Sequence, residues 1–176
     1  MMEASVRRVR PSDARAVATL RHDALRTAPH AFAMSVAQLA APDDPWWERL
    51  CAHTATGKDA LFVVAKSDAL IGMAGFRIDA SEKMSHCGMI WGVFVAPAHQ
   101  QHGYGSLLIH ALLDHGAEHR LRMVKLSVTV NQRRAVTLYE RLGFIIYAKE
   151  PALLYIDNQE IDALHMVYRY PDGGIL

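Results

Sequence analysis

The sequence contains little of what marks secreted, membrane or nucleic-acid-binding proteins. Two cysteines among 176 residues are too few for a disulfide framework, so we expect a reducing, cytoplasmic compartment. No apolar run approaches the ~18 residues that a membrane helix needs, and residues 1–10 lack the apolar core of a signal peptide. A net charge of +1 gives no overall field that would attract nucleic acid or an anionic membrane. We therefore expect neither kind of partner.

What the sequence does have is enough apolar material for one ordinary domain. Hydrophobic residues make up 51% of the chain, and no repeat, low-complexity block or linker divides it. A domain of this size buries about 70% of its unfolded surface and needs no metal or disulfide to fold. We expect a single domain over residues 1–176. Ten histidines keep a metal site under consideration.

The order of apolar patterns predicts an α/β fold with a mixed sheet. A strand, a helix and a strand over residues 89–130 form a βαβ unit, whose two strands should be parallel. The strands before this unit should be antiparallel. We expect strands near residues 6–9, 61–65, 70–78, 89–95 and 124–130, a strand pair on either side of residues 157–159, and helices near 11–26, 45–53, 106–119 and 131–142.

A glycine-rich segment, residues 100–106, links a predicted strand to the start of a predicted helix. Free N–H groups and the positive end of the helix dipole face such a loop, and Gly103 and Gly105 leave the backbone open to an anion. Leu108 stands where a dinucleotide-binding fingerprint needs its third glycine, and the P-loop Gly-Lys-Ser/Thr is absent. These residues alone favour an anion site and a plain connecting turn about equally.

The strand Val93-Phe94-Val95-Ala96-Pro97 followed by Gln100-Gln101-His102-Gly103-Tyr104-Gly105 resembles the acetyl-CoA signature of the GNAT N-acetyltransferase superfamily. Residues 131–144 resemble the second hallmark of the superfamily, at the expected separation, and residues 20–35 are similar to its front end. The resemblance implies a GNAT-like fold, with about seven strands flanked by helices and a splay between the two parallel central strands. It also implies acetyl-CoA as co-substrate, and no metal.

By this resemblance, pantetheine lies in the splay, and backbone amides of the glycine-rich loop bind the pyrophosphate. Asn131 would contact the pantetheine arm and Tyr139 would reach the sulfur as the catalytic acid. On one helix, Asn131, Ala135 and Tyr139 would share a face; without the motif, Tyr139 would be read as a core aromatic. The implied cofactor-binding residues are Phe94, Val95, Gln100, Gln101, His102, Gly103, Tyr104, Gly105, Ser106, Asn131 and Ala135.

The implied reaction is direct attack of a primary amine on the thioester within a ternary complex. A lysine-type ammonium costs about 4.6 kcal/mol to deprotonate at pH 7, so such a substrate needs a general base. The predicted central strand has no carboxylate. His86 is our favoured base, while Asp79 and Glu82 remain alternatives.

Other short patterns have a plainer reading beside the functional one. The run from His115 to His119 matches the H-x-x-E-H zinc pattern, but Gly116 weakens the helix there and no third ligand is identifiable. Cys87 is better read as a small hydrophobe than as a nucleophile. Two residue pairs also have both a structural and a site reading. Trp46 and Trp47 either pack a helix or form walls of the acceptor pocket. Arg133 and Arg134 either belong to a solvated face, or one of them contacts the CoA 3′-phosphate.

We therefore expect an acetyl-CoA-dependent N-acetyltransferase acting on a primary amine. The alternative is a catalytically inactive domain of the same fold that binds CoA as a sensor or structural ligand. By resemblance, residues 27–35 and 157–160 should border the acceptor pocket. Homodimers joined through sheet edges occur in the family, and the sequence leaves the oligomeric state open.

Overall fold

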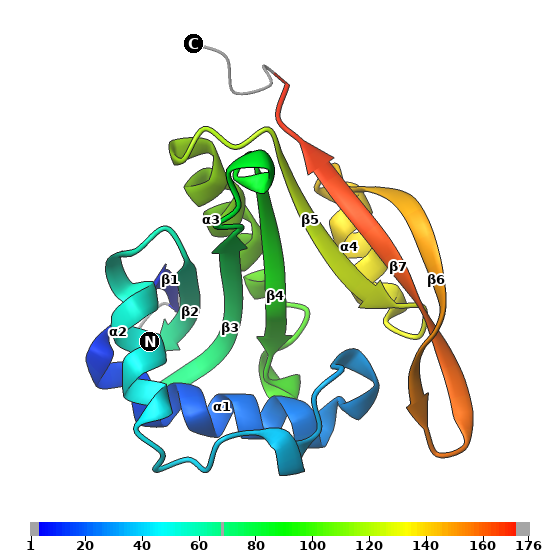
Figure 1. The fold of residues 1–176 in the computed structure, drawn as a ribbon. Coiled ribbons are helices and arrows are strands. Elements are labelled where there is room, and N and C mark those ends of the chain that lie inside the picture. The colour runs from blue at the N-terminus through cyan, green and yellow to red at the C-terminus, as the bar shows by residue number, and fades with distance from the viewer. Residues whose placement is uncertain (1–3, 68, 172–176) are drawn as a thin grey trace.

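The computed structural model describes residues 4–67 and 69–171, which form one seven-stranded mixed sheet (Figure 1). The strand order is β1-β2-β3-β4-β5-β7-β6, and this arrangement confirms the predicted α/β fold class. The pattern of buried and exposed residues in each strand follows which face of the sheet a helix covers. The strands are β1 (Ser5–Arg8), β2 (Ala60–Lys66), β3 (Ala69–Ile78), β4 (Cys87–Val95), β5 (Met123–Thr129), β6 (Ile145–Ile156) and β7 (Gln159–Arg169).

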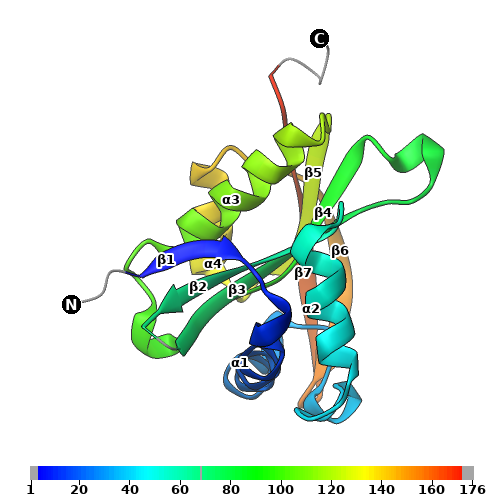
Figure 2. The same ribbon diagram turned by 90° about the vertical axis from the view of Figure 1, so that its left-hand side faces the viewer.

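Helices cover both faces of the sheet. Helices α1 (Ala14–Thr27) and α2 (Trp46–Thr56) lie on one face, and α3 (Tyr104–Glu118) and α4 (Arg133–Arg141) lie on the other (Figure 2). Two hydrophobic clusters match these two layers, one around Phe76, Leu112 and Phe144 and the other around Val17, Trp47 and Met73. None of the helices in the described part of the chain is long and apolar enough to cross a membrane.

The two parallel central strands separate along their length. Strands β4 and β5 pair only where residues 87–89 lie opposite residues 123–125. Beyond that point the strands diverge, as Figure 1 shows, so the backbone groups of residues 90–95 that face β5 have no partner strand beside them. The predicted splay between the parallel strands is confirmed, and it leaves a gap in the middle of the sheet.

A β-bulge marks the place where β4 leaves β5. Trp91 pairs with Gly75 and Phe94 pairs with Met73, so β4 advances three residues while β3 advances two. The extra residue is Gly92, whose φ of +65° lies in the left-handed region that favours glycine. The bulge turns the backbone of β4 at the mouth of the splay.

The expected element boundaries are close to those observed, with one difference that affects the site. Helix α4 begins at Arg133, and Asn131 lies in the preceding turn, two residues before the helix. The expectation that Asn131 shares a helix face with Ala135 and Tyr139 is therefore wrong. The chain must turn sharply after β5, and Gln132 takes the N-cap position instead.

Candidate active site

The glycine-rich loop presents a row of free backbone donors at the start of α3. Within the described chain, the N–H groups of residues 101–106 donate no backbone hydrogen bond, and the first bond back into the loop is from the Leu107 N–H to the Gly103 carbonyl. The first N–H groups of a helix have no partner within the helix, and its dipole is positive at this end. The loop therefore has the donors and the polarity to bind a phosphate.

Two residues of this loop adopt left-handed backbone conformations. Gly103, the N-cap of α3, has φ +83°, and a side chain there would meet nothing within 4 Å. Gln101 has φ +65°, which costs a non-glycine residue roughly 1–2 kcal/mol. The Gln100 amide donates a hydrogen bond of 3.0 Å to the Val95 carbonyl and joins the loop to the end of β4. The backbone strain at Gln101 therefore lies within the segment whose N–H groups are free.

A groove of about 820 Å³ runs from this loop across the splay to α4. Most of the predicted cofactor-binding residues line it, and His102 and Asn131 do not. The His102 ring is exposed and lies against its own loop, with Nδ1 2.7 Å from the Gln100 carbonyl oxygen. The predicted residues that line the groove are Phe94, Val95, Gln100, Gln101, Gly103, Tyr104, Gly105, Ser106, Ala135 and Tyr139.

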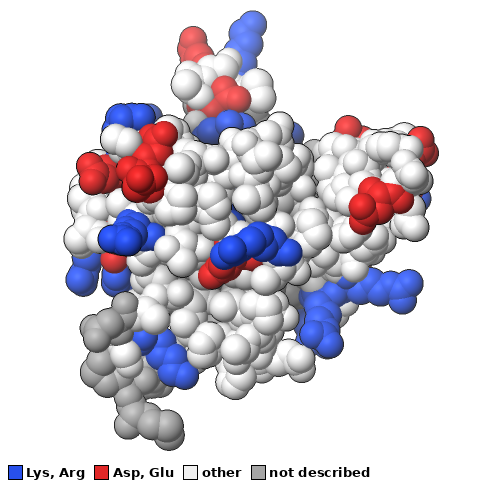
Figure 3. All heavy atoms as spheres, turned by 90° about the horizontal axis from the view of Figure 1, so that it is seen from below, with Lys and Arg blue, Asp and Glu red and all other residues white. Residues whose placement is uncertain are grey.

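Three arginines of α4, namely Arg133, Arg134 and Arg141, also line the groove. The sequence indicates Arg133 and Arg134 as candidate contacts to the CoA 3′-phosphate. It does not indicate Arg141, because only the folded helix brings that residue to the groove. Charges of both signs are scattered over the end of the molecule seen in Figure 3, and no single sign dominates the visible face. The attraction for an anion is therefore local, arising from loop amides and these side chains.

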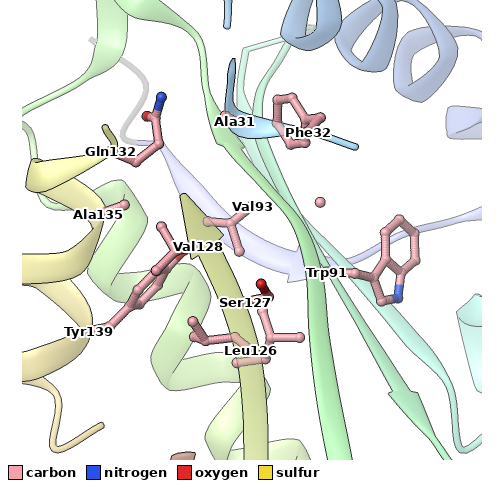
Figure 4. A pocket seen from close by; sticks show the side chains of 12 residues that line it. Ala31, Phe32, Trp91, Val93, Leu126, Ser127, Val128, Gln132, Ala135 and Tyr139 are labelled. Carbon is pink, nitrogen blue, oxygen red and sulfur yellow. The ribbon is translucent and has the colours of Figure 1, made fainter. Parts of the chain in front are cut away.

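A smaller cavity of about 90 Å³ occupies the splay itself (Figure 4). Its walls come from β4, β5, α4 and the short 3-10 helix η2 (Pro29–Ala31) with the following Phe32. A hydrogen bond of 2.8 Å from the Thr129 hydroxyl to the His30 carbonyl ties η2 to the end of β5. The cavity and the groove share Ala31, Phe32, Val93, Gln132, Ala135 and Tyr139, so the two spaces meet.

Tyr139 lies where the groove and the cavity meet. Its side chain is 5% exposed, and burial raises its pKa well above the ordinary tyrosine value, so the hydroxyl stays protonated. The hydroxyl makes no hydrogen bond to any described residue and is not among the fully enclosed polar atoms, so it reaches open space. Tyr139 is therefore a proton-bearing donor with its position fixed by packing and its hydroxyl free.

A polar cluster lies on the opposite side of β5 from α4. Ser127 lines the cavity, and its hydroxyl points into it (Figure 4). Its register partner on β7 is His165, and directly opposed side chains in antiparallel strands lie about 5 Å apart at Cβ. His165 Nε2 is 2.7 Å from a carboxylate oxygen of Glu150 on β6. Sequence reasoning missed this cluster because three separate strands build it.

The sequence candidates for the base lie elsewhere. His86 is exposed and precedes β4, whereas the cavity begins at Ile90, roughly 10 Å of strand beyond Cys87. The Asp79 carboxylate accepts a hydrogen bond from the Ser81 N–H, and Glu82 is exposed. None of the three lines the cavity.

The other short motifs of the sequence have structural roles. His115 is buried in α3, 2.7 Å from the Lys58 carbonyl, and burial lowers its pKa. Across residues 4–67 and 69–171, no group of three or more His, Cys, Asp or Glu side chains is placed to hold a metal ion. Burial raises the pKa of the Cys87 thiol, which disfavours a nucleophilic thiolate. Trp47 is buried against α1, and neither it nor Trp46 lines the cavity.

The loop with free backbone donors lies beside a splayed pair of parallel strands, and this combination can be compared with known families. The sequence model of the Acetyltransferase (GNAT) family matches residues 18–144. The chain belongs to this family, and the predicted family membership is confirmed.

Two solved structures share the fold over nearly the whole chain. A GNAT-family acetyltransferase from Streptococcus pneumoniae superposes with a TM-score of 0.85 at 21% identity, covering 96% of this chain and 100% of that one. A Salmonella typhimurium protein solved with its cofactor acetyl-CoA superposes with a TM-score of 0.80 at 21% identity, covering 95% and 94%. At these identities the likeness establishes the fold.

Curated relatives match about half of the chain. The mycothiol acetyltransferase of Acidimicrobium ferrooxidans is 30% identical over 95 residues, which are 53% of this chain and 31% of that protein. The mycothiol acetyltransferase of Streptomyces scabiei is 34% identical over 94 residues, 53% of this chain and 29% of that protein. The chain therefore matches less than a third of the length of each.

Proposed function

We propose that this protein transfers an acetyl group from acetyl-CoA to a primary amine. The observation that carries the proposal is the junction at Tyr139, where a groove with free loop amides meets a cavity that opens between β4 and β5. A long anionic thioester fits the groove, and a small nucleophile fits the cavity. The two reactants would then meet beside a buried hydroxyl.

The residues present fit acetyl-CoA as the co-substrate. The amides of residues 101–106 would bind the pyrophosphate, because each charge-assisted hydrogen bond adds about 1.5–3 kcal/mol and several converge on one group. The unpaired backbone of β4 at Phe94 and Val95 would bind the pantetheine amides, and α4 would close the groove from the other side. Acetyl-CoA supplies the activated carbonyl, and the chain positions it.

The reaction then needs one proton removed and one supplied. The neutral amine nitrogen forms a bond to the thioester carbon, the C–S bond breaks, and the proton that the nitrogen gives to the base is balanced by one that the thiolate takes from solvent. A thiol pKa of ~8.5 lies below that of tyrosine, so full transfer from Tyr139 is uphill, and burial raises the difference. The Tyr139 hydroxyl therefore acts mainly by donating a hydrogen bond to the developing thiolate.

For the proton on the amine, we propose His165 as the base, acting through the Ser127 hydroxyl, because Ser127 lines the cavity and His165 lies behind it. Its ring lies across the β5–β7 register from Ser127, which lines the cavity, and Glu150 can stabilise the imidazolium that forms. In other enzymes, a carboxylate that is hydrogen-bonded to the second ring nitrogen of a histidine base stabilises the imidazolium in this way. His86 remains the competing candidate; like His165 it lies outside the cavity wall, and the first residues of β4 separate it from the cavity.

The proposal is tested by CoA thiol release from acetyl-CoA over a panel of primary amines, with mass detection of the acetylated product. Turnover of at least one amine class, with one acetyl group added per thiol released, is the expected result. Tight acetyl-CoA binding with no turnover on any amine would favour the sensor alternative. Absence of acetyl-CoA binding would overturn both.

A further inference from the structure

One half-buried arginine of α1, Arg21, has an enclosed side-chain nitrogen without a hydrogen-bond partner. Among the described residues, only two buried side-chain polar atoms lack a hydrogen bond, Arg21 Nη1 and His30 Nδ1. Burial lowers the pKa of the Arg21 guanidinium, and no described carboxylate forms an ion pair with it. An enclosed donor without an acceptor costs the full desolvation of that group. A ligand that accepts a hydrogen bond from Arg21 Nη1 would offset this cost.

Two other half-buried arginines of the same chain show how this protein normally treats the group. Arg7 binds Asp13 through both terminal nitrogens, at 2.6 and 2.9 Å. Arg8 donates to three backbone carbonyls, those of Thr54, Gly57 and Asp59. The unpaired Nη1 of Arg21 is therefore an exception to the pattern within this molecule.

Arg21 lies against the wall of the acceptor cavity. Its guanidinium carbon is 4.4 Å from the ring centroid of Phe32, and Nη1 is 3.5 Å from the place that a Cβ on Gly92 would take. Phe32 and Gly92 both line the cavity, and Figure 4 shows Phe32 and Trp91 on this side of it. The guanidinium packs on the Phe32 ring. Because Gly92 has no side chain, none separates Arg21 Nη1 from the β4 backbone at the bulge.

We propose that Arg21 binds a carboxylate carried by the acceptor, so that the substrate is a small molecule with an amine and a carboxylate close together. This inference rests on the proposed function. A guanidinium fork matches the two oxygens of a carboxylate. Gly92 lies beside Arg21 Nη1, and the next residue, Val93, lines both the cavity and the groove proposed for the thioester, so the carboxylate and the reacting amine would lie one or two residues of strand apart.

The spacing favours an amino acid over a protein chain as acceptor. One residue of strand spans about 3.3 Å, which corresponds to the few bonds between an α- or β-amine and its carboxylate. A protein amino terminus carries an amide in place of that carboxylate, and it would leave Arg21 without a partner. Free amino acids and their carboxamides differ in this one group, so they form the matched test.

The test measures binding and turnover separately. In the CoA complex, the side-chain N–H signals of ¹⁵N-labelled arginine are followed by NMR during titration with N-acetyl amino acids and with the matching carboxamides. Turnover of the twenty amino acids, their carboxamides and the matching aminoalkylphosphonates is measured by thiol release. The variants are Arg21→Gln, Arg21→Lys, and Arg26→Gln as a control on the exposed side of the same helix, where Arg26 pairs with Asp23.

We expect at least one carboxylate to bind about tenfold or more tightly than its carboxamide and to shift the Arg21 signal. Both Arg21 variants should lose this preference for the carboxylate. Arg21→Lys should lose it because an ammonium lacks the guanidinium fork. The control Arg26→Gln should keep the preference. Carboxylate binding at Arg21 without any turnover would contradict the proposed function and support this inference. Equal use of acids and amides, an Arg21→Gln variant that retains the preference, or a preference for phosphonates would overturn the inference and leave amine acetylation standing.

Discussion

The indole of Trp91 on β4 occupies the space that a side chain on Gly75 of β3 would need. An added Cβ at position 75 would lie 2.1 Å from Trp91 Cε2, and the two residues are register partners in the antiparallel pair. The indole is therefore held flat across a bare stretch of β3, at the acceptor side of the cavity. The shape of this wall depends on a glycine that touches no substrate.

Replacing Gly75 with Ala should move the indole and distort the cavity. We expect kcat/KM for the acceptor to fall about tenfold or more, because a displacement of 1 Å in a positioning group can cost about 10²-fold in rate. The dissociation constant for acetyl-CoA should change little, since Gly75 does not line the groove. Acceptor kinetics, calorimetric CoA binding and near-ultraviolet circular dichroism of the tryptophans measure the three effects. An unchanged indole signal with full activity would contradict the argument.

Replacing Tyr139 with Phe removes the free hydroxyl at the junction and keeps the packing against Phe144, whose ring centroid is 5.9 Å away. We expect kcat to fall about 10²-fold, the lower end of the range for loss of one hydrogen-bond donor to a developing charge. Acetyl-CoA affinity should stay within about threefold. Steady-state kinetics and calorimetry separate the two, and an unchanged kcat would remove Tyr139 from the chemistry.

Replacing Gly103 with Ala puts a side chain at φ +83° where space is open, so strain at the backbone is the main effect. The expected cost is roughly 1–2 kcal/mol, which the loop can relieve by turning its amides away from the phosphate. CoA affinity should fall about tenfold. Gly143→Ala is the matched control, with φ +90° at the end of α4 and no place in the groove, and it should lower stability without changing CoA affinity. Equal CoA affinity in both variants would contradict a phosphate role for the loop.

The His165–Glu150 pair is tested by acceptors of different basicity. A lysine-type amine costs about 4.6 kcal/mol to deprotonate at pH 7 and an α-amine near ~7.8 costs about 1 kcal/mol, so loss of the base should slow the first class far more. We expect His165→Gln to lower kcat about 10²-fold or more for amines of high pKa. Glu150→Gln should lower it less, and the double variant should resemble His165→Gln.

His86→Gln is the control in the same assays. If His86→Gln reproduces the dependence on amine pKa and His165→Gln does not, the base is His86, and the β5–β7 cluster has no catalytic role.

Asp13 gives a prediction for stability against pH. Its hydrogen bonds from Arg7 lower the pKa of the Asp13 carboxyl, helped by a backbone bond from Arg10. A carboxyl with a lowered folded-state pKa stabilises the fold above its unfolded value of about 4, and this stability is lost as the pH falls through the folded value. Asp13→Asn should cost about 1–3 kcal/mol at pH 7. Urea unfolding from pH 7 down to pH 3 should show the difference from wild type shrinking, and a constant difference would contradict the assignment.

The sequence predicted those parts of the site that lie within one segment of chain. The loop from Gln100 to Ser106 is read directly, because a strand end, two glycines and a helix start follow one another. The strand order near β4 and β5 follows from the βαβ unit in the same way. Tyr139 came from a resemblance, and whether it acts in catalysis is still a prediction.

The features that the sequence could not predict depend on contacts between distant segments. Arg21 reads as one more arginine of an amphipathic helix until α1 is docked beside the bulge at Gly92. His165 and Glu150 meet Ser127 only through the register of three strands. The expected helix start at Asn131 failed because the turn after β5 takes up two residues before the helix begins.

The most direct test of the account is acetyl transfer to a free amino acid and to its carboxamide, measured side by side with wild-type protein. We predict acetyl-CoA-dependent thiol release with one acetylated product per turnover. We also predict that kcat/KM for the free amino acid exceeds that for its carboxamide about tenfold or more. Tight binding of acetyl-CoA without release of thiol in the presence of any amine would contradict the central claim.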